Sequence, residues 1–292
     1  MYYLLLAASV AVSVTKNIIT KTDKRCFSGR KNQLFVNIVT GIIALVVFGI
    51  FVRDIGIVRD AKFLVLSLFY GIFTMTGQMF YISALETGPV SVCTMIYSCG
   101  FIIPTVFAAV YYHEAMSIPC IIGIILILVS IVLVTGKIER AKDGRWIFFA
   151  VGSMVSSGLI GVIQKLFRAG FDGGVNEYLF VSFAVMLVFS AVMYPFAGGK
   201  DTAVCEGEEK PKPKIQRRLF LSSVFGLGIV LANKFNLYLS GVLPGIVFFP
   251  AINGGVLAFT ALASSIILRE KLTALQWIGI ALGIVSIVLV AL

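Results

Sequence analysis

The residues of this chain best suited to bind a solute are polar side chains that stand inside long apolar segments. If those segments cross a membrane, such side chains tend to face the bundle interior or a water-filled cavity. Amide, hydroxyl and ammonium groups can hold a small molecule by hydrogen bonds and charge without reacting with it. The candidate substrate-binding residues are Gln78, Tyr81, Tyr97, Gln164, Asn233, Lys234, Asn236 and Asn253.

Two further lysines are candidates for attracting charge. Lys16 and Lys165 stand 149 residues apart, each near the end of an apolar segment. A pair of cations suits an anionic or zwitterionic substrate. The alternative, favoured for each lysine taken alone, is that its ammonium snorkels to lipid headgroups. Lys234 is harder to explain in this way, because nonpolar residues precede it and two asparagines lie close to it.

Reactive groups are scarce. The sequence has one histidine, His113, and lacks HExxH, CxxC and GxxxxGK[ST] motifs as well as paired acids within an apolar segment. Its five cysteines are scattered and suggest neither a disulfide framework nor a metal site. The sequence therefore predicts neither an enzyme nor an ATP-driven pump, and we expect no cofactor and no metal.

The composition indicates that lipid surrounds the chain. Hydrophobic residues make up 59% and charged residues 13% of the sequence, and the mean hydropathy is +1.01, whereas globular domains are roughly 45–50% apolar and 25% charged. The net charge of +10 resides mainly in short gaps between apolar segments. Anionic headgroups, rather than nucleic acid, are the expected partner of these basic residues.

Ten segments are long and apolar enough to span a bilayer as helices. Hydrocarbon offers the backbone no partners, and these segments lack the alternation of barrel strands, so we predict an all-α integral membrane protein. A charged stretch at 198–218 that contains prolines should form a flexible polar loop. The predicted spans are 2–19, 33–52, 62–84, 89–112, 118–136, 146–168, 178–197, 219–240, 243–268 and 273–292.

The two halves of the sequence are related. At an offset of 156 residues, Glu114 aligns with Glu270, and the six residues from Val129 match those from Val285 without a difference. We predict five-helix repeats at 1–144 and 145–292. An odd number of helices per repeat inverts the second copy, an arrangement common in secondary transporters that work by alternating access.

Prolines interrupt corresponding spans in the two halves. Pro104 lies in the fourth span and Pro250 in the ninth, and interrupted helices in corresponding positions are the best sequence indication of a transporter site. Small residues nearby also permit close helix packing. For the glycines near these two prolines, packing and cavity lining therefore both stay open. Cavity lining is the favoured interpretation for Tyr97 and Asn253.

Several short motifs resemble the drug/metabolite transporter superfamily, specifically its ten-helix EamA-type exporters. The motifs are Tyr81-Ile82-Ser83-Ala84-Leu85 with Gly88-Pro89, and Glu114-Ala115-Met116 with Gly123; the second half has Tyr238-Leu239-Ser240, Pro244-Gly245, Glu270-Lys271-Leu272 and Gly279. The resemblance covers nearly the whole chain and implies transport without naming a substrate. Related small multidrug exporters carry a buried glutamate in their first helix, whereas the first span here has no acidic residue.

The membrane orientation receives two conflicting indications. Assigned to the nearest loop, 17 basic residues belong to odd-numbered loops and 6 to even-numbered loops, which predicts that both termini face outward. The family resemblance implies cytoplasmic termini instead. The orientation stays open at this point.

These features favour a secondary transporter, most simply an exporter of small metabolites or drug-like molecules in the cell membrane. Its expected partners are a small-molecule substrate and anionic lipid, it is not expected to bind nucleic acid, and it would act as a monomer or homodimer. Two alternatives remain: a flippase for lipid-linked substrates, and a membrane scaffold or sensor that transports nothing.

Overall fold

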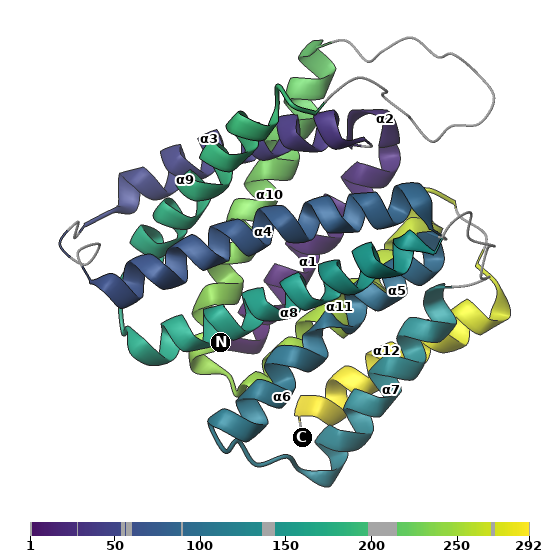
Figure 1. Cartoon of the computed structure of the whole chain (residues 1–292). Coiled ribbons are helices and arrows are strands. Elements are labelled where there is room, and N and C mark those ends of the chain that lie inside the picture. Colours follow the sequence, from purple (N-terminus) through teal and green to yellow (C-terminus); the bar gives the residue numbers. More distant parts are fainter. Residues whose placement is uncertain are drawn as a thin grey trace.

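The chain forms a bundle of membrane-spanning helices (Figure 1). The computed structural model describes residues 2–27, 29–53, 56, 60–88, 90–135, 144–197, 215–269 and 272–291, and contains no strand within those ranges. The helices that span alone are α1 (Tyr2–Thr22), α3 (Arg30–Phe51), α4 (Ala61–Thr87), α7 (Ile118–Thr135), α8 (Arg145–Gly170), α9 (Val175–Met193), α10 (Ile215–Val242), α11 (Gly245–Ile267) and α12 (Ala274–Ala291).

The fourth span is built from three pieces, and a short helix, α2 (Lys24–Phe27), follows the first span. These pieces are α5 (Val90–Ser98), the 3-10 turn η2 (Cys99–Phe101) and α6 (Ile102–Tyr111). Eight spans are long, while the apolar parts of α7 and α12 are shorter. All ten predicted spans are confirmed. The predicted loop 198–218 ends earlier than expected, because α10 begins at Ile215; residues 198–214 lie outside the described ranges.

Proline breaks a helix in the first half of the chain and leaves one intact in the second. Pro104 cannot donate to the carbonyl of Gly100, and the chain tightens into η2 directly before α6. Pro250 lies inside α11, which continues through it, so the predicted interruption of the ninth span is wrong. The carbonyl that Pro250 leaves free is that of Ile246, and the Cys120 thiol from α7 lies 3.9 Å from this oxygen.

Helix contacts follow the internal repeat. Exchange of the two halves relates α1 to α8, α3 to α9, α4 to α10, α5 and α6 to α11, and α7 to α12. This exchange turns the α4–α8 contact into the α10–α1 contact, and the α4–α9 contact into the α10–α3 contact. The contacts α3–α9 and α7–α12 each join a helix to its own counterpart, so the exchange leaves them unchanged. All these pairs are in contact. The fold is thus two inverted five-helix repeats packed closely together.

The backbone has the same conformation just after the fourth and the ninth span, at positions that the internal repeat aligns. Among the described non-glycine residues, only His113 and Arg269 have positive φ, 52° and 54°. Such values are uncommon for residues with a side chain, and the two positions are separated by the repeat offset of 156, each directly before a glutamate. The same local turn therefore occurs in both halves.

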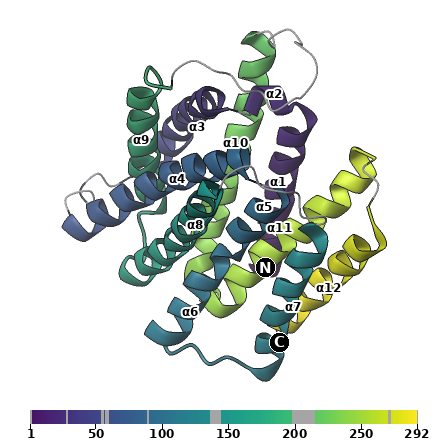
Figure 2. The ribbon, with the colours of Figure 1, turned by 45° about the vertical axis from the view of Figure 1, so that its right-hand side comes forward.

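Buried apolar residues form two main cores, and each core draws on both halves. The first core joins α2, α3, α4, α8, α9 and α10. The second core joins α1, η2, α6, α7, α11 and α12, with the end of α10. Figures 1 and 2 show the helices α3, α4 and α9 on one side of the molecule, and α7 and α12 on the other.

Glycines at repeat-related positions allow α7 and α12 to pack closely. A Cβ on Gly123 would lie 2.6 Å from Val290 Cγ2 and 2.9 Å from the Ser286 carbonyl oxygen, and one on Gly279 would lie 2.8 Å from Leu133 Cβ. Ser130 Oγ donates to the Gly279 carbonyl at 2.7 Å. Without a hydrophobic driving force between helices in lipid, such close approach is what holds them together.

We predict that Gly123→Val destabilises the protein by roughly 1–3 kcal/mol, because the added atoms meet backbone that cannot rotate away. The measurement is thermal unfolding of purified protein in detergent. Gly170→Ala is the control, since a Cβ there meets nothing within 4 Å. Equal unfolding temperatures for the two variants would contradict the packing described here.

Candidate functional site

A buried tyrosine joins two of the predicted binding residues. Tyr70 of α4 is 2% exposed, and its hydroxyl donates to the Asn233 side-chain oxygen of α10. The Gln164 amide of α8 donates to the same hydroxyl at 3.1 Å. Asn233 also donates to the carbonyl of Ile229 in its own helix at 2.8 Å. Three helices from both halves thus share one polar cluster inside the first core.

Sequence reasoning missed Tyr70. It stands among aromatic and aliphatic residues in the third span, and its hydroxyl was the one signal of a polar role. A buried hydroxyl needs a partner, and asking which amides could supply one would have brought Tyr70 together with Asn233 or Gln164.

An ion pair links the two halves on the side of the molecule that carries the connections at 112–117, 171–174 and 243–244 and both ends of the described chain. We call this side of the molecule the termini face. Lys165 Nζ of α8 lies 2.9 Å from Glu114 Oε1 and donates to the carbonyl of Leu243 at 3.3 Å. Glu114 Oε2 accepts the backbone N–H of Ile246 at 3.0 Å, in the first turn of α11. The Lys165 charge, predicted to attract substrate, is balanced by a carboxylate in this structure.

The Glu114 carboxyl is stabilised in its charged form. Partial burial acts to raise its pKa, but hydrogen bonds from Lys165 and from the N–H groups of Ile246 and Gly245, together with the Lys165 charge, hold the pKa below its ordinary value. A helix N-terminus favours a negative charge in the same way. Glu114 therefore caps α11.

Lys16, the sequence counterpart of Lys165, has different surroundings. Its ammonium lies 5.9 Å from the centroid of the Phe225 ring, and within the described ranges no carboxylate pairs with it. The next residue, Asn17, donates to Thr260 Oγ1 of α11 at 3.2 Å. Glu270, which aligns with Glu114, lies outside the described residues.

Tyr81 and Tyr97 lie together near the opposite face, where α4 ends and α5 begins. Their ring centroids are 4.6 Å apart, and the Tyr81 hydroxyl lies 3.1 Å from Thr94 Oγ1. Gln78, a turn away on α4, accepts from Gln33 Nε2 of α3 at 3.4 Å. The three predicted residues thus belong to contacts between neighbouring helices.

Of the remaining asparagines, Asn236 contacts another helix and Asn253 contacts its own helix. Ser9 Oγ of α1 donates to the Asn236 side-chain oxygen at 2.6 Å, which ties α1 to α10. Asn253 donates to the carbonyl of Phe249 in its own helix at 2.9 Å. The eight predicted binding residues therefore form separate groups. That they line one substrate cavity remains a prediction.

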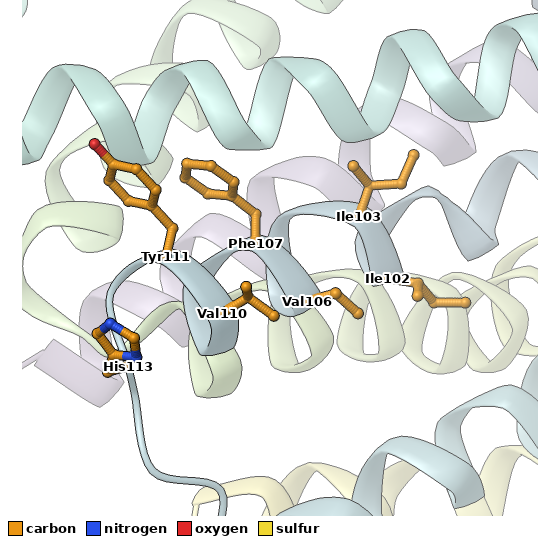
Figure 3. A pocket seen from close by; sticks show the side chains of 7 residues that line it. All are labelled: Ile102, Ile103, Val106, Phe107, Val110, Tyr111 and His113. Atoms are coloured by element: carbon orange, nitrogen blue, oxygen red, sulfur yellow. The ribbon is translucent and has the colours of Figure 1, made fainter.

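A cavity of about 870 Å³ runs along α6, and a smaller one is described below. Figure 3 shows Ile103, Phe107 and Tyr111 projecting from one side of α6, and Ile102, Val106 and Val110 from the other, with His113 at its end. The lining is almost wholly apolar and contains none of the predicted binding residues. This groove suits hydrocarbon rather than a polar solute.

The smaller cavity, about 290 Å³, includes Lys234, one of the predicted binding residues. It lies between α1, α9 and α10, toward the termini face. Among the described residues, no group of three or more His, Cys, Asp or Glu side chains is arranged to hold a metal ion.

Two inverted five-helix repeats with polar groups inside the bundle are the arrangement common in secondary transporters. Comparison with known proteins gives the family. The EamA-like transporter family matches residues 1–136 and 144–292. Uncharacterized protein MJ1333.1 of Methanocaldococcus jannaschii is 30% identical over 109 residues, 36% of this chain and 78% of that protein. One solved crystal structure matches with a TM-score of 0.72 over 99% of this chain and 95% of its own, at 12% identity, which shows the fold alone. The chain belongs to the EamA-like transporter family.

We predict that Tyr70→Phe lowers the free energy of unfolding by about 1 kcal/mol, because Gln164 and Asn233 lose a shared buried partner. Thermal unfolding in detergent measures the effect. Tyr111→Phe is the control, since Tyr111 is 61% exposed and lies on α6. A Tyr70→Phe variant as stable as the control would show that the cluster contributes nothing to stability.

The ion pair predicts a pH dependence. Because the folded-state pKa of Glu114 lies below its ordinary value of 4.5, the stability that this shift contributes is present above pH 4.5 and is lost as pH falls through the lowered pKa. Glu114→Gln should therefore unfold at a lower temperature than the parent protein at neutral pH. The difference should shrink in acid.

A double-mutant cycle with Lys165→Gln tests the pairing itself. Coupling between the two substitutions is expected at neutral pH and should fade in acid. Additive effects at neutral pH, or a difference between Glu114→Gln and the parent that stays constant into acid, would contradict the assignment.

Proposed function

We propose that this protein is a secondary transporter that exports small metabolites or drug-like molecules by alternating access, without ATP. Family membership supports transport, and the observation that carries the mechanism is the exchange symmetry of the helix contacts. Two copies of one unit in opposite orientations can exchange their conformations, which moves an opening from one face of the membrane to the other.

The parts that move against each other would be the two cores rather than the two halves. Each core mixes helices from both repeats, so separation of the halves would disrupt both cores. The Glu114–Lys165 pair joins the loop after α6 to α8, and hence the second core to the first. Opening toward the termini face would break this pair, while contacts such as Tyr81 with Thr94 would hold the opposite face closed.

The substrate would pass between the cores, in contact with polar side chains on α4, α8 and α10. Its partners would be the solute and a bilayer with anionic headgroups, in the cell membrane, with the protein a monomer or homodimer. The predicted binding residues Gln78, Tyr97 and Asn253 belong to this proposal. We propose no enzymatic activity and no cofactor.

Flux across proteoliposomes tests the proposal. Purified protein in vesicles without ATP should release preloaded solutes from a metabolite panel faster than empty vesicles do. Asn233→Leu should reduce that flux at least severalfold, whereas Lys62→Gln, at an exposed site in the first turn of α4, should leave it unchanged. No flux of any solute or lipid would overturn the transporter function.

The apolar groove along α6 favours a second candidate, a flippase for lipid-linked substrates. A groove of about 870 Å³ with an almost wholly apolar lining could hold an acyl chain beside the bundle. Dithionite quenching of a fluorescently labelled lipid in the same vesicles distinguishes the two functions: lipid movement without solute flux would replace the exporter with a flippase.

A further inference from the structure

The cavity of about 290 Å³ combines a cation with an apolar wall. Leu5 of α1, Val175 of α9 and Phe235 of α10 supply apolar surface, while Lys234, Tyr238 and Asn176 supply polar groups. Ligand pockets usually measure about 300–1,000 Å³. This cavity therefore suits a small solute or one end of a larger one.

The Lys234 ammonium lacks a negative partner. It lies 4.7 Å from the centroid of the Phe51 ring at the end of α3, and no carboxylate in the described ranges pairs with it. An aromatic face compensates a cation only partly. Among the described residues, the charge of Lys234 is thus left for an anion to balance.

Two more polar groups in the cavity are unused. The Asn176 side-chain oxygen is buried and has no donor among the described residues, and an amide can present either an acceptor or a donor. The Tyr238 hydroxyl makes no hydrogen bond in the described part of the chain, and its residue is 37% exposed. An anion could accept hydrogen bonds from the Tyr238 hydroxyl and from the amide N–H groups of Asn176.

The neighbouring carboxylate is directed elsewhere. Glu177 is 6% exposed, accepts the backbone N–H of Arg53 at 2.8 Å and does not line the cavity. Val175 and Asn176 open helix α9, and the first N–H groups of a helix have no partner within it. The cavity therefore offers an ammonium, a hydroxyl and an amide together with aliphatic and aromatic surface.

We propose that Lys234, Tyr238 and Asn176 bind the anionic group of an amphiphilic solute whose apolar part lies against Leu5, Val175 and Phe235. The proposal rests on the transporter function, and assigns the substrate class as small organic anions or zwitterions with an apolar body. The same chemistry would also hold a lipid phosphate. Lys234 lies eight residues before the end of α10, roughly 12 Å along the helix, so the site stands near the termini face, where a solute would enter or leave.

Binding of a charged probe and of its neutral analogue tests the site directly. The probes are 3-phenylpropionate and 3-phenylpropionamide, measured by calorimetry on the full chain in phosphatidylcholine nanodiscs. The acid should bind at least tenfold more tightly than the amide. Lys234→Gln should weaken binding of the acid at least tenfold and leave the amide unaffected, since a charge-assisted hydrogen bond is lost. Lys62→Gln, the matched exposed control, should bind both probes like the parent protein.

Nanodiscs with added phosphatidylglycerol distinguish solute from lipid. If lipid phosphate occupies the site, this lipid should compete with the acid in the parent protein, and Lys234→Gln should abolish its enrichment around the purified protein. Either result supports an anion site. Equal affinity for acid and amide, or unchanged affinity in a folded Lys234→Gln variant, overturns the proposal.

Flux measurements keep the two proposals separate. Solute flux that is insensitive to Lys234→Gln would preserve the transporter function and remove this site from it. Binding of the acid that depends on Lys234, with no flux of any solute, would preserve the anion site and overturn the transporter function.

Discussion

Each half of this protein buries its helices chiefly against the other half. The extensive contacts are α7 with α12, α4 with α8, α3 with α9 and α1 with α10, and every one of them joins the two repeats. In lipid, no hydrophobic force brings helices together, and they depend on close van der Waals contact and buried hydrogen bonds. The glycines of α7 and α12, the two cores and the polar cluster around Tyr70 all follow from this arrangement. Neither repeat could be a rigid body by itself, which is why alternating access here would move one core against the other.

Within that arrangement, charge is confined to places where it is balanced or can reach water. Lys165 would be costly inside the bundle, but Glu114 and the Leu243 carbonyl surround its ammonium. The pair lies between the cores and not inside one. In the proposed mechanism a bond there would hold one face closed, and it also contributes to the stability of the folded protein, as the effect predicted for Glu114→Gln requires. Lys234 differs, since in the described part of the chain its ammonium lies over the Phe51 ring and is paired with no carboxylate.

Hydropathy and the internal repeat were sufficient to predict the fold, because neither depends on contacts between distant side chains. The ten spans and the duplication required no knowledge of which side chains meet. The site was less accessible to prediction. Asn253 donates to the carbonyl of Phe249 in its own helix, and its place in a substrate cavity stays a prediction. Tyr70 and Gln164 meet only through the crossing angle of α4 and α8, and the pairing of Glu114 with Lys165 depends on a turn at His113 that hydropathy does not register. Proline patterning misled for Pro250 because a helix in a packed bundle can continue through a proline.

The symmetry of the scaffold does not extend to its polar cluster. At the offset of 156, Tyr70 aligns with Gly226 and Asn233 aligns with Gly77, so the counterpart of the Tyr70–Asn233 hydrogen bond would join two glycines. Both glycines serve packing: a Cβ on Gly226 would lie 3.1 Å from Thr40 Cα, and one on Gly77 would lie 2.9 Å from Ser156 Cβ. At these positions each half thus carries one hydrogen-bonding residue and one glycine, so exchange of the two halves does not map the polar cluster onto itself. Conformational exchange requires only that the backbone repeats, as the turns at His113 and Arg269 do. Binding requires a particular set of side chains. In the proposed mechanism one set suffices, because the same side chains would line the substrate path in both conformations. Under the proposed function, substitutions among these polar residues would change the cargo while the inverted scaffold stays the same.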